Sequence, residues 1–113
     1  MLTVHHLENS RSQRILWLLE ELGLSYEIKR YERDKKTNLA PAALKAVHPL
    51  GKSPVLEDDG AVYAETGAII DHLLDQHAEG KLRPPRGTPA FDRYRYWMYA
   101  AEGTYMPPLV FTL

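Results

Sequence analysis

The period of the apolar residues changes twice within the first 31 residues, and this change is the strongest constraint on the fold. Residues 2–6 form a short apolar, partly β-branched run that predicts a strand. A helix is predicted next, because apolar residues recur at helical spacing at Ile15, Leu16, Leu18, Leu19 and Leu22 before Gly23 ends the pattern. Residues 25–31 then alternate with period two, as a half-exposed strand does. We therefore expect two parallel neighbouring strands joined by a right-handed crossover.

Residues 32–80 complete the predicted domain. Residues 40–47 form a short helix pattern with Pro41 near its first turn, where a missing N–H costs least. Residues 55–57 and 61–63 are two short strands around Asp58-Asp59-Gly60, a strong hairpin signal. Thr66 is expected to cap a last helix that ends near Gly80. The element order βαβ-α-ββα predicts an α/β, thioredoxin-like fold with a mixed four-stranded sheet.

A proline-rich segment follows this predicted domain and divides the chain. Residues 81–89 have the composition of a linker, so we expect one domain at 1–80 and a second, all-α and incomplete, at 90–113. The pattern from 90 to 101 is helical and rich in aromatic residues, and we expect Gly103 and Met106-Pro107-Pro108 to interrupt it. So much aromatic surface on one helix suggests a partner.

Composition excludes several classes of function. The formal net charge is −1, so nucleic-acid binding has little support, and the basic cluster between Lys29 and Lys36 is interpreted as a solvated face. The chain has no cysteine, which removes disulfides and thiolate metal sites. His5 and His6 point to opposite faces of a strand, and His72 and His77 are poorly spaced on a helix, so no metal site is expected. The chain start lacks a signal peptide, which favours a cytoplasmic location.

Three motifs carry a resemblance to a known family. They are NSRSQRILWLLEEL at 9–22, HPLGKSPVL at 48–56 and ETGAII at 65–70. In this order and spacing, the motifs resemble the amino-terminal domain of bacterial and fungal cytosolic glutathione S-transferases. The resemblance covers nearly the whole chain. In that family this domain binds glutathione, and a carboxy-terminal helical domain supplies most of the pocket for the electrophile.

The resemblance implies a set of residues that bind glutathione. Pro54 corresponds to a cis-proline that presents the backbone of Ser53 to the cysteinyl unit, and Lys52 lies where the glycyl carboxylate would bind. Thr66 would hold the γ-glutamyl carboxylate at a helix start, while Glu65 pairs with the ammonium group. Without the resemblance, the same residues are a trans proline that begins an edge strand, a solvated lysine and an ordinary threonine cap beside an exposed glutamate.

The residue that activates the thiol is less clearly indicated. Family members use a tyrosine near the end of the first strand, or a serine or cysteine near the first helix, but residues 5–7 contain no tyrosine and cysteine is absent. Ser10 matches the serine type best, and its hydroxyl would donate a hydrogen bond to the sulfur and favour the thiolate. Ser12 and Asn9 are alternatives, although Ser12 also fits a plain N-cap, and a site without a side-chain activator stays open.

Two functions follow from the resemblance. The first is an enzyme, a glutathione S-transferase that transfers glutathione to an electrophile, with glutathione as a substrate, no metal, a role in detoxification and a homodimeric state. The second is a non-catalytic glutathione-binding module without the electrophile pocket. The electrophile itself is not indicated, because related scaffolds also support peroxidase, isomerase and dehalogenase chemistry.

Overall fold

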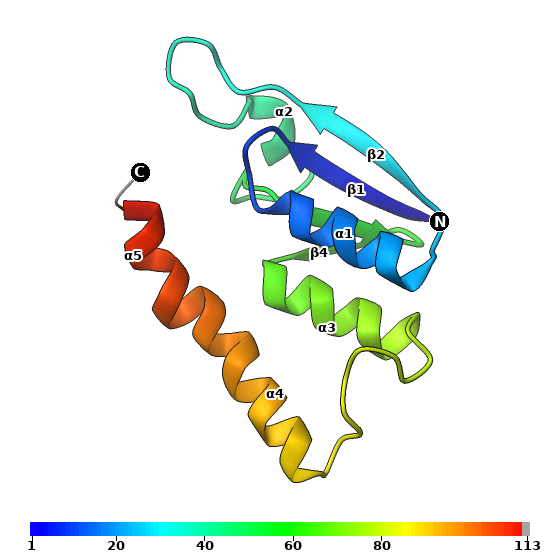
Figure 1. Ribbon diagram of the computed structural model, residues 1–113. Helices are drawn as coiled ribbons and strands as arrows, with labels where there is room; N and C mark the ends of the chain where they lie inside the picture. Colours follow the sequence, from blue (N-terminus) through cyan, green and yellow to red (C-terminus); the bar gives the residue numbers. More distant parts are fainter. Residues whose placement is uncertain (112–113) are drawn as a thin grey trace. The chain divides into compact units, whose positions relative to one another are not determined.

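The computed structural model describes residues 1–111, and its first part is built on a four-stranded sheet. The strands β1 (Leu2–Leu7), β2 (Tyr26–Tyr31), β3 (Val55–Asp58) and β4 (Ala61–Ala64) lie in the order β2-β1-β3-β4. β1 pairs parallel with β2, whereas β3 is antiparallel to both of its neighbours (Figure 1). The mixed sheet and the order of the elements confirm the predicted thioredoxin-like fold.

Local sequence signals explain where most of these elements end. Helix α1 (Ser12–Leu22) ends at Gly23, whose left-handed φ of 67° makes the predicted C-cap. Asp59 and Gly60 both have positive φ, 47° and 86°, as a tight turn between β3 and β4 requires. Two helices are shorter than predicted: α2 spans Ala42–Lys45, and α3 (Thr66–Gln76) ends before Gly80.

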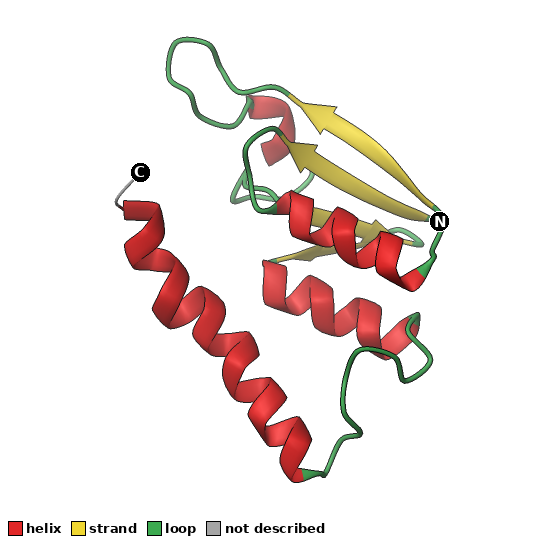
Figure 2. Cartoon of the chain, viewed as in Figure 1, coloured by secondary structure: helices red, strands yellow, loops and turns green. Residues whose placement is uncertain are grey.

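The two faces of the sheet are covered by different helices (Figure 2). Because side chains alternate along β1, Val4 and His6 point to one face, whereas His5 and Leu7 point to the other. On the second face, Leu7 packs with Tyr31 of β2 and with Leu44, the fully buried side chain of α2. The first face carries α1, as the contact of His6 with the first residue of α1 demonstrates.

The described chain separates into two compact units, the first formed by Met1–His72 and the second beginning at Leu73. The second unit contains α4 (Pro89–Ala100), the π-helix η1 (Ala101–Tyr105) and α5 (Met106–Phe111). The predicted interruption is confirmed only in part: α4 ends at Ala100, before Gly103, but the chain stays helical as the π-helix η1, and Pro107 and Pro108 lie inside α5 rather than ending the helix. The last two residues of the predicted segment 90–113 lie outside the described residues.

The second unit exposes several of its aromatic side chains. Thr88 caps α4 by accepting a hydrogen bond from the Phe91 N–H at 3.2 Å, and Phe91 is buried. By contrast, Tyr96, Trp97 and Tyr99 are 57–69% exposed. Among residues 1–111, no helix is both long enough and apolar enough to cross a bilayer.

Candidate functional site at one edge of the sheet

The register of the strands places the end of β1, the start of β3 and the end of β4 at one edge of the sheet. His5, near the end of β1, pairs with Val55, the first residue of β3. Val55 in turn pairs with Ala64, the last residue of β4. The turn after β1, the approach to β3 and the exit from β4 therefore leave the sheet at the same edge.

These three connections contain all the site residues predicted from the sequence. Ser10 lies in the turn after β1, residues 52–54 form the approach to β3, and Glu65 and Thr66 follow β4 directly. Segments more than 50 positions apart in the chain thus converge, as the motif resemblance implied. All of these residues belong to the first unit.

The turn after β1 is held in place from outside by an arginine. Asn9 has a positive φ of 53°, a conformation that asparagine tolerates better than most residues. Arg33, which follows β2, donates hydrogen bonds to the carbonyl of Glu8 at 3.1 Å and to that of Asn9 at 2.9 Å. The sequence analysis interpreted the basic cluster that contains Arg33 as a solvated face, so this contact was missed.

A chain of hydrogen-bonded hydroxyls runs through the site. The Ser12 hydroxyl lies 2.6 Å from Nδ1 of His6 and 2.7 Å from the Ser10 hydroxyl. Ser10 donates to the Ser53 hydroxyl at 3.2 Å, and Ser53 donates to the backbone carbonyl of His5 at 3.1 Å. The strand β1, the first turn of α1 and the approach to β3 are therefore joined by side chains as well as by the sheet.

Ser12 does not occupy the N-cap position that the sequence allowed for it. Arg11 takes that position without a side-chain cap, and Ser12 is the first helical residue, fully buried. The oxygen of Ser10 lies 3.3 Å from the Ser12 N–H and accepts its hydrogen bond, so Ser10 performs part of the capping. Because Ser10 is only half-buried, its hydroxyl is closer to solvent than that of Ser12.

The approach to β3 has the geometry that the resemblance implied. The Ser53–Pro54 peptide bond is cis. Lys52 is exposed and Ser53 is half-buried, whereas Gly51 before them is buried. Gly51 has a φ of 61°, and a Cβ at this position would lie 2.5 Å from Cγ of Lys45, so a side chain here would require Lys45 to move.

The start of α3 presents backbone N–H groups and an acid. Glu65 has a φ of 75° and an exposed side chain, and its carbonyl accepts the hydrogen bond of the Ile69 N–H at 3.0 Å. Thr66 is the first helical residue rather than the cap, and it is 6% exposed. The N–H groups of a first helical turn have no partner within the helix, so they favour an anion.

Arginine charge lies close to Ser10 along the chain. Burial, and then the charge of Arg11, lowers the pKa of Arg14. An arginine nevertheless stays protonated in proteins, so both side chains carry positive charge at the first turn of α1. A positive charge near a thiol favours the thiolate.

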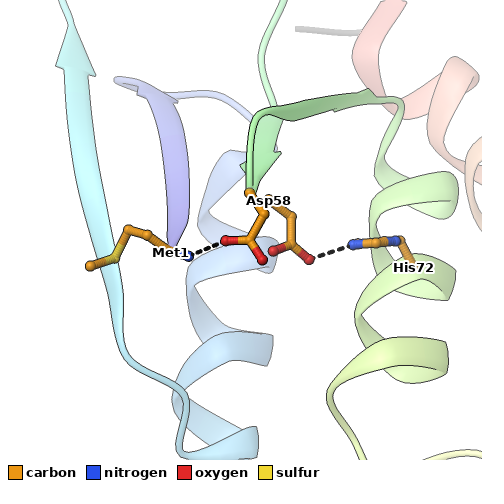
Figure 3. A network of polar contacts seen from close by, with 4 residues as sticks. Met1, Asp58 and His72 are labelled. Atoms are coloured by element: carbon orange, nitrogen blue, oxygen red, sulfur yellow. Dashed lines mark hydrogen bonds and ion pairs between the residues drawn. The ribbon is translucent and has the colours of Figure 1, made fainter.

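The other histidines of the first unit lie in separate networks. His5 contacts the Tyr31 hydroxyl and a Glu57 carboxylate oxygen, each at 2.8 Å, on the opposite face from His6. His72 contacts Asp58 at 2.7 Å, at the far end of β3 from Pro54 (Figure 3). The opposite orientation of His5 and His6 confirms the prediction from strand alternation.

Comparison with known proteins identifies the family. The family model "Glutathione S-transferase, N-terminal domain" matches residues 1–75. The chain belongs to the glutathione S-transferase family. Glutathione S-transferase 3 of Schizosaccharomyces pombe is 42% identical over 107 residues, an alignment that covers 95% of this chain and 43% of the relative.

Solved glutathione S-transferase structures have the same fold. The enzyme of Actinobacillus pleuropneumoniae is 48% identical with a TM-score of 0.89, and the match covers 97% of this chain and 52% of that one. A Sulfitobacter glutathione transferase homologue, solved with bound glutathione, is 28% identical with a TM-score of 0.76 and coverages of 92% and 50%. The present chain thus spans about half the length of these glutathione S-transferase relatives.

Proposed function

We propose that this chain is the glutathione-binding part of a glutathione S-transferase and that Ser10 activates the glutathione thiol. The observation that carries the proposal is the convergence of Ser10, residues 52–54 and Glu65-Thr66 on one edge of the sheet. A peptide ligand bound there would meet a hydroxyl donor, the backbone before the cis-proline and a helix start. The helix start suits a carboxylate, and the exposed acid suits an ammonium group.

The magnitudes support Ser10 as the activator. Lowering the pKa of a thiol from ~8.5 by about two units requires roughly 2.7 kcal/mol. A hydrogen bond to a charged acceptor contributes roughly 1.5–3 kcal/mol, and a nearby helix N-terminus roughly 0.3–1 kcal/mol. One serine hydroxyl just before the first turn of α1 is therefore sufficient. Full burial makes Ser12 a poor donor to a bound ligand, and Asn9 is exposed beyond the hydroxyl chain.

Calorimetric titration with glutathione tests the binding site. We expect Glu65→Ala and Thr66→Ala each to weaken binding at least about tenfold, since each removes a charged or charge-assisted contact. Glu32→Ala, which removes another exposed acid of the same unit, serves as the matched control and should bind normally. Unchanged affinity in both site variants would contradict the assignment.

The reaction is thiolate attack on an electrophilic carbon, and we expect a cytosolic homodimer with a role in detoxification. A non-catalytic glutathione-binding module is the second candidate, because the proposed site residues all act on glutathione and none of them binds an electrophile. Conjugation of a general aromatic electrophile by the purified chain separates the two. Binding of glutathione without conjugation would support the module, and the absence of binding would contradict both candidates.

A further inference from the structure

The geometry points to His6 as a positioning residue that sets, through Ser12, the direction in which Ser10 donates its proton. This inference rests on the proposed role of Ser10 at the glutathione sulfur. His6 itself does not touch the ligand in this scheme. Its Nδ1 is the end of the hydroxyl chain that passes through Ser12 to Ser10, with links of 2.6 and 2.7 Å.

The hydrogen bonds that link His6, Ser12 and Ser10 can run in two directions, as a count of their protons shows. A serine hydroxyl has one proton to donate and can accept at its oxygen. If Nδ1 of His6 carries a proton, it donates to the Ser12 oxygen, and Ser12 donates onward to Ser10. In its contacts with Ser12, Ser10 is then an acceptor only: its oxygen accepts from the Ser12 hydroxyl and from the Ser12 N–H at 3.3 Å. The Ser10 proton is thereby directed outward, to Ser53 or to a bound sulfur.

The reverse direction withdraws that proton from the ligand. If Nδ1 of His6 is unprotonated, it accepts from Ser12, and Ser12 is satisfied by accepting from Ser10. The Ser12 oxygen is then an inward acceptor for the Ser10 proton and competes for it with a thiolate. The state of one ring nitrogen therefore sets whether Ser12 competes with the sulfur for the proton of Ser10.

The burial of Ser12 makes this coupling strong. Ser12 is 0% exposed, so water cannot replace a missing partner, and a buried polar group without a partner is costly. An alternative acceptor for its proton, the Leu7 carbonyl, lies 3.4 Å away, longer than either link of the chain. The Ser12 hydroxyl therefore donates its proton either to Nδ1 of His6 or to the Ser10 oxygen.

The matched variants His6→Asn and His6→Asp test the direction. The two side chains have nearly the same shape, but the amide can donate to Ser12, whereas a carboxylate can only accept. The readout is the thiolate absorbance of bound glutathione, titrated with pH. We expect His6→Asn to keep the pKa of the bound thiol within about 0.5 unit of the wild type and His6→Asp to raise it by about 1 unit, a tenfold lower thiolate fraction.

The Ser12→Ala background separates this effect from simple charge repulsion. A carboxylate at position 6 would also raise the pKa of the thiol through space, whether or not Ser12 is present. If His6 acts through Ser12, the difference between the Asn and Asp variants falls to less than half when Ser12→Ala is added. An unchanged difference in that background would overturn the inference.

Controls keep this inference distinct from the proposed function. Binding of S-methylglutathione, which has no ionisable thiol, should be the same in the two His6 variants and reports a folded site. His72→Asn removes a histidine that contacts Asp58, at the other end of β3, and should leave the pKa of the bound thiol unchanged. If Ser10→Ala raises the pKa of the thiol but His6→Asp does not, His6 has no positioning role and Ser10 keeps its own. If the wild type does not bind glutathione, the proposed function itself fails.

Discussion

The two faces of the sheet use neighbouring histidines for different purposes. On the face covered by α2, both ring nitrogens of His5 have partners, Tyr31 and Glu57, and the ring is buried. On the face covered by α1, Nδ1 of His6 contacts a serine chain that leads to the edge of the sheet. On one face the buried histidine links the buried Tyr31 to the partly exposed Glu57, and on the other the histidine connects the sheet to the candidate site. A one-residue step along β1 thus separates a histidine held in a structural network from a histidine whose contacts lead to the candidate site.

The largest effect is expected at Leu44, which anchors α2 on the His5 face. Leu44 is fully buried against Leu7 and Tyr31, so Leu44→Ala should lower the free energy of unfolding by about 2–5 kcal/mol. Denaturant unfolding measures the loss. Ala43→Ser, at an exposed position of the same helix, is the control and should cost less than about 0.5 kcal/mol. A loss below about 1 kcal/mol for Leu44→Ala would mean that this face is not closed by α2.

Ser10→Ala tests the face that leads to the site. The variant should raise the pKa of the bound thiol by about 1–2 units, because a hydrogen bond to the thiolate of roughly 1.5–3 kcal/mol is lost. The free energy of unfolding should change little, since Ser10 is only half-buried. The thiolate absorbance titration measures the first quantity and denaturant unfolding the second. An unchanged pKa of the thiol would remove Ser10 from the mechanism.

His5→Phe should have the opposite pattern. The change leaves the Tyr31 hydroxyl and the Glu57 carboxylate without their histidine, at a cost of about 1–3 kcal/mol in the free energy of unfolding. The pKa of the bound thiol should stay the same. If His5→Phe shifted the pKa of the bound thiol as strongly as His6→Asp, the comparison would fail, because residues on both faces of the sheet would then affect the site.

The smallest effect is expected at Asp75, in the second unit. Hydrogen bonds from Arg83 and then Arg86 hold the pKa of this carboxyl below its usual 3.8. A lowered pKa contributes stability that is present above the unfolded value and is lost as the pH falls through the folded one. Asp75 is 37% exposed, so solvent screening limits the contribution to about 0.5–1 kcal/mol.

The variant Asp75→Asn measures this contribution. The difference in unfolding free energy from the wild type should be constant from neutral pH to about pH 4 and should shrink at lower pH. The pKa of the thiol of bound glutathione should stay the same, so this variant serves as a reference that changes neither face of the sheet. A difference that grows as the pH falls would contradict the assigned direction of the pKa shift.

The sequence predicted the elements well because their signals are local. Gly23 ends α1 and Asp59-Gly60 turns the hairpin, since each position needs a positive φ that few residues adopt readily. The helical segment after residue 100 was predicted less well. Gly103 and two prolines suggested a break, but a π-helical stretch accommodates the glycine, and prolines are tolerated in the first turn of α5.

The candidate site was only partly predictable, since its decisive contacts are not local. Alternation along β1 indicated that His5 and His6 diverge, but not that His6 meets Ser12. The contact between Ser10 and Ser53 joins residues 43 positions apart, and the hydrogen bonds from Arg33 bridge 24 and 25 positions. No periodicity or capping rule encodes such pairs, because they depend on strand register.

The sequence by itself determined the order of strands and helices, the turn between β3 and β4, the end of α1 and, through three motifs, the family. The tertiary structure alone decided that Ser12 is buried inside the first turn of α1 and connects His6 to Ser10. The physical reason is that turn and cap preferences act over a few residues, whereas a hydroxyl chain forms only where packing brings distant segments within hydrogen-bond distance.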